Sequence, residues 1–311
     1  MTLRLVSYNV RYFGHWLKGL ASTATAKRRI AQALAALEPK ADVIALQEVE
    51  TRSMRAKVAH RGAHPSETQL EAFLRHLGAA LQARGVSMSY HAWYFPAHTY
   101  RLGPLTLYTT GLAVLVNSDT LHVTQDNGRT PHHVTHHRSP RLKRVKQTRI
   151  AAHLALETLE GKPFHLFNTH LSLPSPLARE YWSQEKKMGF GKNQVEEAKA
   201  LCAYVSATSK GQPRLVVGDF NSAPATPVYR ALTTDAKLTG AQEALGQVDA
   251  TRCDSFATAG FMALRMHLDH VFGGGNIEFV DLEGTYPFGD PGNPFHGLSD
   301  HVPLITRFDV R

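Results

Sequence analysis

The sequence predicts an α/β fold in which two β-sheets pack face to face and helices cover the outside. Short apolar runs bounded by polar residues recur along the chain, as at 3–6, 43–46 and 164–167, and such runs are typical of buried strands. Many successive strand candidates also lack an intervening helical segment. That order favours a two-sheet sandwich over a doubly wound parallel sheet.

Helical segments are marked by apolar or small residues three and four positions apart. The segment 27–37 has this spacing and is closed by Pro39, and 68–83 repeats the pattern. Further helices are expected at 193–208 and 226–234.

Strands are expected at 3–6, 42–47, 88–95, 105–116, 148–157, 163–169, 214–218, 268–272, 277–281 and 302–310. The basic and polar stretch 50–66 predicts a loop with some helix, and the glycines of 273–276 predict a hairpin turn between two strands. The chain contains no linker, internal repeat or second core pattern, so we expect residues 1–311 to form one domain.

Composition favours a globular protein with a polyanionic partner. The net charge of +9 and the pI of about 9.6 suit nucleic acid or an anionic membrane surface, although solubility alone is an alternative reading.

No stretch approaches the roughly 20 apolar residues of a membrane span. Met1 and Thr2 lead straight into the first strand without a signal-peptide pattern, so we expect a cytoplasmic protein. Cys202 and Cys253 lack metal-ligand spacing and predict reduced thiols.

Polar side chains close several of the apolar runs. Five short segments stand out: Ser7-Tyr8-Asn9, Leu46-Gln47-Glu48, Asn168-Thr169-His170, Gly218-Asp219-Phe220-Asn221 and Ser299-Asp300-His301. Acids, amides and histidines are costly in a core but useful at the edge of a sheet, where ligands bind. Taken singly, each has a structural reading, such as a turn acid for Asp219, a turn cap for Asn9 or a surface acid for Glu48.

In this order the five segments resemble the endonuclease/exonuclease/phosphatase superfamily, which includes DNase I-like nucleases, sphingomyelinases and inositol-polyphosphate 5-phosphatases. The resemblance runs from Asn9 to His301. It implies a DNase I-like, four-layer α/β/β/α sandwich of two mixed β-sheets. It also implies a phosphoric ester hydrolase that depends on Mg²⁺ or Mn²⁺.

The resemblance assigns the metal to Glu48 and Asp300, whose carboxylates are the hard oxygen donors that such ions prefer. Asn9 resembles the asparagine that holds the metal-binding carboxylate and its water shell.

The catalytic roles come from the same resemblance. Asp219 and Asn221 correspond to the pair that orients the attacking water and a phosphate oxygen. His301 is the candidate base, alone or jointly with Asp219, and Asp269 corresponds to the acid that fixes its ring. His170 stands where abasic-site endonucleases carry a different motif, and it resembles the histidine that stabilises the phosphoryl oxygen or assists the leaving group.

Two long segments, both expected to be loops, bear on the substrate. The stretch 127–149 carries seven Lys/Arg, no acid and four histidines. Arg149 resembles a phosphate-contacting arginine, and the other substrate-binding candidates are Arg141, Lys143, Arg144 and Lys146. A solvated basic hairpin is an equal alternative. The stretch 171–192 carries aromatic residues, including Tyr181 and Trp182, that suit a surface lid or contact with substrate.

We therefore favour a nuclease acting on DNA or RNA. The alternatives are a sphingomyelinase-like phospholipid phosphodiesterase, which would touch a membrane through 171–192, and an inositol or other small-molecule phosphatase. A non-catalytic binding module on the same scaffold is disfavoured by the intact acid set. No obligate protein partner is evident from the sequence.

Overall fold

The computed structural model describes residues 1–14, 24–53, 67–102, 105–135, 147–174, 188–249, 251, 256–261, 264–283 and 287–311. The strands are β1 Thr2–Asn9, β2 Val43–Ser53, β3 Tyr90–Leu102, β4 Leu105–Asn117, β5 Leu121–Asp126, β6 His132–His133, β7 Ile150–Thr158, β8 Pro163–His170, β9 Arg214–Asp219, β10 Thr239–Gly240, β11 Ala259–Phe261, β12 Leu264–Met266, β13 Asp269–Gly274, β14 Ile277–Leu282 and β15 Leu304–Val310. The α-helices are α1 Ala24–Ala35, α3 Gln69–Gln82, α5 Lys192–Ser209, α6 Pro227–Arg230 and α7 Ala241–Ala244; η1 Arg11–Phe13 is a 3₁₀-helix and η4 Ala231–Asp235 a π-helix.

Within the described residues, one sheet has six strands in the order β14-β15-β1-β2-β4-β3. The other has the order β10-β13-β9-β8-β7-β5, with β6 paired to β7. Both sheets are mixed, because β1 runs parallel to β2 and β8 runs parallel to β9 while their other neighbours are antiparallel. A short hairpin, β11-β12, lies apart from these sheets.

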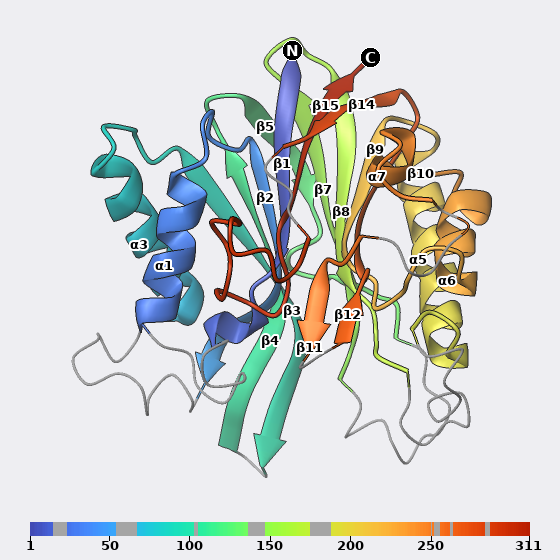
Figure 1. Ribbon diagram of the computed structural model, residues 1–311, viewed down its shortest axis with the longest axis horizontal. Coiled ribbons are helices and arrows are strands. Elements are labelled where there is room, and N and C mark those ends of the chain that lie inside the picture. Colours follow the sequence, from blue (N-terminus) through green and yellow to red (C-terminus); the bar gives the residue numbers. More distant parts are fainter. Residues whose placement is uncertain are drawn as a thin grey trace.

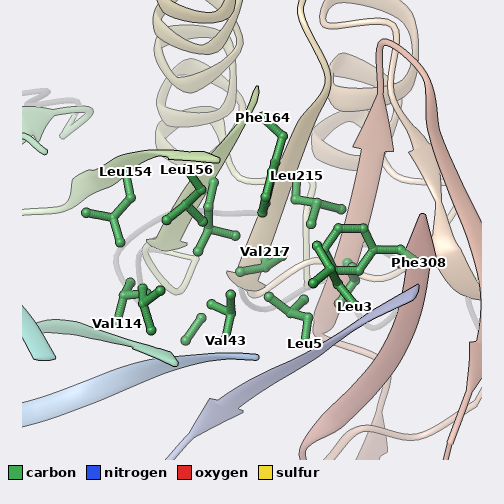
Figure 2. Close-up of a cluster of buried hydrophobic side chains, with 14 of the residues drawn as sticks. Leu3, Leu5, Val43, Val114, Leu154, Leu156, Phe164, Leu215, Val217 and Phe308 are labelled. Carbon is green, nitrogen blue, oxygen red and sulfur yellow. The ribbon is translucent and has the colours of Figure 1, made fainter. Parts of the chain in front are cut away.

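The main core lies between the two sheets. Figure 2 shows Leu3, Leu5, Val43 and Val114 from one sheet facing Phe164, Leu215 and Val217 from the other. Alternate residues of β1 point the other way, and Val6 and Tyr8 pack beneath the outer helices. Both faces of the central strands are therefore buried, which explains why they read as continuous apolar runs.

Helices cover the outer faces of both sheets. Figure 1 shows α1 and α3 on one side of the molecule and α5 and α6 on the other. Phe73 and Leu77 of α3 are buried against the first sheet, and Leu201 and Val205 of α5 against the second. A capping box between Thr68 and Glu71 begins α3. The predicted α/β/β/α sandwich is confirmed.

Three local predictions are wrong. Residues 50–53, expected to lie in a loop, belong to β2, which continues to Ser53, and Glu50 is buried; residues 54–66 lie outside the described residues. The expected hairpin at 273–276 is a crossover, because β13 pairs with β9 in one sheet and β14 pairs with β15 in the other. Part of 127–149 is strand, since His132 and His133 pair with β7.

No helix within the described residues is long and apolar enough to cross a bilayer.

Candidate active site

Asn9 is the last residue of β1. It lies at one end of the sandwich, where its side chain reaches Asp219 of the second sheet. The segment before β15 is fastened there by Ser299, whose hydroxyl donates to the Asn9 carbonyl at 2.7 Å and accepts from the His301 amide at 3.3 Å. The serine of the Ser-Asp-His motif thus joins segments 290 residues apart. It sets the position of Asp300 and His301 beside β1.

Glu48 lies inside β2, at an irregularity of the strand rather than at its end. The pairing of β2 with β4 shifts register between Leu46 and Val49, and Glu48 has a φ of +55°. A left-handed backbone is unfavourable for a residue with a side chain, and such strain persists where the surroundings enforce it. The bulge turns the Glu48 carboxylate toward Asn9, whose Nδ2 donates to Glu48 Oε1 at 3.4 Å.

Two buried amides join the sheets directly beneath the site. Gln47 Nε2 donates to Asn168 Oδ1 at 2.8 Å. Asn168 Nδ2 in turn donates to the backbone carbonyls of Leu46 and Ala113. Buried polar groups need such partners, and this pair fixes β8 relative to β2.

The end of β9 is shaped by Gly218 and Asn221. Gly218 has a φ of +137°, and a Cβ on it would lie 2.0 Å from the Thr169 carbonyl oxygen of β8. Asn221 has a φ of +48°, a conformation that asparagine tolerates better than most residues. The backbone amide of Asn221 donates a hydrogen bond to Asp219 Oδ1 at 2.9 Å. The Gly-Asp-Phe-Asn segment is therefore the end of β9 followed by a bend at Asn221, and it directs Asp219 and Asn221 into the site.

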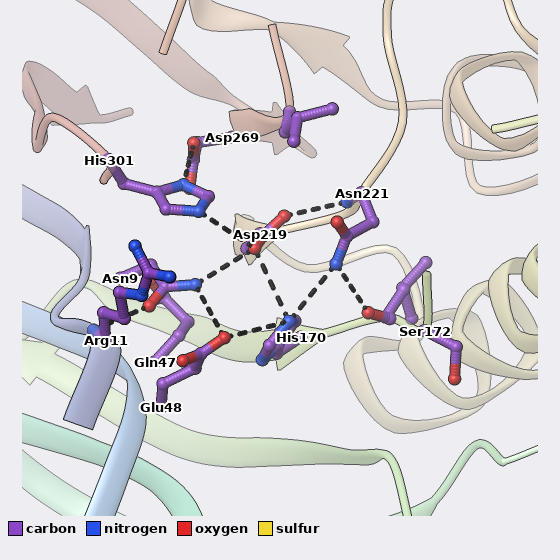
Figure 3. A network of polar contacts seen from close by, with 12 residues as sticks. Asn9, Arg11, Gln47, Glu48, His170, Ser172, Asp219, Asn221, Asp269 and His301 are labelled. Atoms are coloured by element: carbon purple, nitrogen blue, oxygen red, sulfur yellow. Dashed lines mark hydrogen bonds and ion pairs between the residues drawn. The ribbon is translucent and has the colours of Figure 1, made fainter. Parts of the chain in front are cut away.

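Asp219 lies at the centre of the polar network (Figure 3). Its Oδ2 accepts a hydrogen bond from Asn9 Nδ2 at 3.0 Å and lies 3.5 Å from His170 Nε2 and 3.7 Å from His301 Nε2. Burial raises the pKa of Asp219, while the positive charge of His301 opposes that shift. An acid with a raised pKa can take or release a proton near neutral pH.

His301 is paired with Asp269 through its other ring nitrogen. His301 Nδ1 and Asp269 Oδ2 are 2.8 Å apart, and both side chains are buried. Burial disfavours the protonated ring, but the carboxylates of Asp269 and Asp219 outweigh it and raise the pKa of His301. The pairing leaves His301 Nε2 directed at Asp219.

His170 contacts Asn221 and lies near Arg149. Asn221 Nδ2 lies 3.2 Å from His170 Nε2, and burial, followed by the charge of Arg149, lowers the pKa of His170 well below its usual range. A pocket of about 250 Å³, open solvent included, lies beside Glu48 and His170, and Arg149 lines it. The positively charged guanidinium of Arg149 therefore lies close to Glu48 and His170.

The residues fit a divalent metal. Burial raises the pKa of Glu48, and the nearby Asp300 carboxylate raises it further. Asp300 is held by Arg11, with Oδ2 2.7 Å from Nη1. Hard oxygen donors that repel one another in a half-buried site are what Mg²⁺ or Mn²⁺ would stabilise.

A second set of residues could in principle hold a metal ion. The possible ligand atoms of Asp219, Asp269 and His301 lie within 4.8 Å of one another. The close His301–Asp269 hydrogen bond already engages two of these ligand atoms. This group is therefore better suited to proton transfer than to holding an ion.

The structure brings together eight of the predicted residues: Asn9, Glu48, His170, Asp219, Asn221, Asp269 and His301 with Arg149 beside them. Asp300 adjoins them next to His301. The other predicted substrate-binding residues, Arg141, Lys143, Arg144 and Lys146, lie outside the described residues, as do Tyr181, Trp182 and Cys253.

Sequence reasoning missed three residues near this site. Arg11 binds Asp300. The buried Gln194 of α5 donates to the Ser172 and Asn221 carbonyls at 2.9 and 2.7 Å. The Thr258 hydroxyl donates to Asp269 Oδ2 at 2.7 Å. Only Arg11 had a usable signal, because it follows Asn9 by two positions.

Comparison with solved structures finds the same fold. The catalytic domain of human Nocturnin, solved with a bound sulfate, has a TM-score of 0.61 and 17% identity, covering 100% of this chain and 95% of that chain. ANGEL2, a 2′,3′-cyclic phosphatase, has a TM-score of 0.65 and 15% identity, covering 99% and 95%. A mannosyl-6-phosphatase from Bacteroides thetaiotaomicron has a TM-score of 0.59 and 16% identity, covering 99% of each. No curated protein sequence matches.

A family model gives the assignment. The model of the Endonuclease/Exonuclease/phosphatase family matches residues 6–189 and 203–301, which include every one of the five motif segments. The matched span and the shared fold agree with the polar residues gathered at the sheet edge. The chain therefore belongs to the endonuclease/exonuclease/phosphatase family of phosphoesterase hydrolases.

Proposed function

We propose that this chain is a single-domain, divalent-metal-dependent phosphodiesterase that hydrolyses nucleic acid. The observation that carries the proposal is the arrangement around Asp219. Asn9, His170 and His301, from both sheets, direct nitrogen atoms at one buried carboxylate oxygen. Such a group of coupled acids and bases at one edge is costly for stability and useful for catalysis.

Glu48 and Asp300 would hold the metal, and Asn9 would orient the Glu48 carboxylate. When bound, Mg²⁺ or Mn²⁺ supplies positive charge that polarises the phosphoryl oxygen and stabilises the leaving oxygen.

Asp219, paired with His301, would accept the proton of the attacking water. The Asp269 carboxylate holds the His301 ring, so Nε2 faces Asp219 and the two groups can share one proton. Asn221 Nδ2 and the neutral His170 would contact the phosphoryl oxygens, where hydrogen bonds stabilise developing charge. Arg149 would contribute a positive charge beside them.

The net charge of +9 and the basic stretch 127–149 support a nucleic-acid substrate. A second candidate, a small phosphoester, is supported by the similar fold of the mannosyl-6-phosphatase from Bacteroides thetaiotaomicron. The phospholipid alternative shares the same catalytic residues.

The testing experiment is a substrate panel with Mg²⁺ or Mn²⁺: plasmid DNA, single-stranded DNA, RNA, sphingomyelin, an inositol phosphate and bis-p-nitrophenyl phosphate. We expect cleavage of a polynucleotide and of the small diester, both abolished by a chelator. Hydrolysis of sphingomyelin or of the inositol phosphate without polynucleotide cleavage would overturn the nuclease assignment.

A charge variant tests the substrate class separately. Replacing Arg141, Lys143, Arg144 and Lys146 together by Ser should weaken polynucleotide binding and flatten its salt dependence, because fewer counterions are released. Hydrolysis of bis-p-nitrophenyl phosphate should not change. The matched control removes the same charge from exposed positions on or next to helices: Arg28, Arg29, Arg84 and Lys199. Equal effects of the two variants would show that net charge alone matters.

A further inference from the structure

Thr258 lies beneath the Asp269–His301 pair, in a segment for which no role has been assigned. It immediately precedes β11 and its side chain is fully buried. Its backbone joins two neighbours, because its amide donates to the Met266 carbonyl at 2.9 Å and its carbonyl accepts from the Val302 amide at 2.8 Å. The backbone alone therefore holds Thr258 next to His301.

The hydroxyl of Thr258 has a fixed direction. Its oxygen accepts hydrogen bonds from the backbone amides of Leu268 and Asp269, at 2.9 and 3.0 Å. A hydroxyl has two acceptor sites and one proton, so both acceptor sites are used. The proton is left for Asp269 Oδ2, which lies 2.7 Å away.

Asp269 Oδ2 thus receives two hydrogen bonds, one from Thr258 and one from His301 Nδ1. Two hydrogen bonds to one carboxylate oxygen restrict the rotation of the carboxylate. A rotated Asp269 would release the His301 ring and turn Nε2 away from Asp219.

We propose that Thr258 is a positioning residue: its hydroxyl locks Asp269, and through Asp269 it sets the orientation of the His301 ring. The inference rests on the proposed function, in which His301 and Asp219 handle the proton of the attacking water. Thr258 itself touches no reacting atom, so it acts only through Asp269.

The kinetic test compares three variants. Thr258→Val keeps the shape but lacks the hydroxyl, Thr258→Ser keeps the hydroxyl, and Thr306→Val is the matched control. Thr306 is equally buried, in β15, and its hydroxyl has no hydrogen-bond partner among the described residues. With Mn²⁺ and bis-p-nitrophenyl phosphate, we expect Thr258→Val to lower kcat about 10–100-fold at unchanged KM, as losses of supporting hydrogen bonds do. Thr258→Ser and Thr306→Val should keep the parent kcat.

A spectroscopic test needs no substrate. A proton held between His301 Nδ1 and Asp269 should give a low-field NMR resonance that disappears in His301→Ala. We expect this resonance to shift or broaden in Thr258→Val and to be restored in Thr258→Ser. If Thr258→Val does not fold by circular dichroism, Thr258→Ala replaces it.

The outcomes separate the two proposals. If the parent hydrolyses no phosphoester, the proposed function fails while the NMR comparison still tests the role of Thr258. If a folded Thr258→Val keeps both the parent kcat and the parent resonance, the positioning role is overturned. Loss of activity in Thr258→Ser equal to that in Thr258→Val would also overturn it, because the hydroxyl would then not be the group that matters.

Discussion

Replacement of Gly218 by Ala should damage both stability and activity. Gly218 pairs with Thr169 across the parallel β8–β9 ladder. A methyl group there would lie 2.0 Å from the Thr169 carbonyl oxygen and 3.0 Å from its carbonyl carbon, both of which are backbone atoms. No side-chain rotation can relieve that overlap, so the two strands must separate or β9 must twist.

The magnitude has two parts. A φ of +137° is rarely adopted by residues with a side chain, and such strained conformations cost of order 1–3 kcal/mol. Overpacking a rigid interior costs about another 1–3 kcal/mol. A destabilisation of about 2–6 kcal/mol is a large share of the roughly 5–15 kcal/mol that stabilises a typical domain.

The assay is urea denaturation followed by circular dichroism, with Gly161→Ala as the matched control. Gly161 also has a positive φ, +77°, but a Cβ on it would meet no atom within 4 Å. Gly161→Ala should therefore show only the backbone part, about 1–2 kcal/mol for a left-handed residue. If the Gly218→Ala variant proves no less stable than the Gly161→Ala variant, the steric reasoning is refuted.

Three further predictions concern the site and its surroundings. Asp219→Asn and His301→Ala should each lower kcat by about 10²–10⁴-fold with an unchanged circular dichroism spectrum, and the double variant should lose less than the product because the residues act as one unit. Glu48→Gln should raise the Mn²⁺ concentration needed for half-maximal activity and weaken Mn²⁺ binding by calorimetry; unchanged binding would remove Glu48 from the metal site. Burial lowers the pKa of His270 to about 4, so its contribution to stability is complete above about pH 6.5 and is lost as the pH falls toward 4. At pH 4.5 the parent should therefore lose about 2–3 kcal/mol of unfolding free energy that His270→Gln retains, measured by urea denaturation against pH 7.

The sequence predicts the elements that bury a continuous strand or a full helical stripe of apolar side chains. Strand β9 was expected at 214–218 and ends at Asp219, and α5 was expected at 193–208 and spans Lys192–Ser209. Periodicity is strong in such segments because apolar side chains must fill a core. The edge strand β5, with most of its side chains exposed or half-buried, has no such pattern and was not predicted.

The parts of the site that the sequence did not predict depend on local backbone irregularity or on distant partners. Glu48 was expected at a strand end, but it occupies a bulge whose register shift depends on pairing with β4. Thr258 and Gln194 gain significance only from contacts with Asp269 and Asn221, and no spacing in the chain encodes those contacts. The roles of such residues depend on contacts between segments far apart in the chain, and a local sequence pattern does not predict those contacts.

The pairing of β15 between β14 and β1 has a consequence for synthesis on the ribosome. Asn9 of β1 is translated 290 residues before Ser299, whose hydroxyl holds the segment of Asp300 and His301 beside it. The side chains contributed by β1 therefore have no partners from this segment until β15 and the residues before it have been made. Under the roles proposed above for Asp300 and His301, we expect hydrolytic activity only after both residues have been translated and β15 has paired with β1.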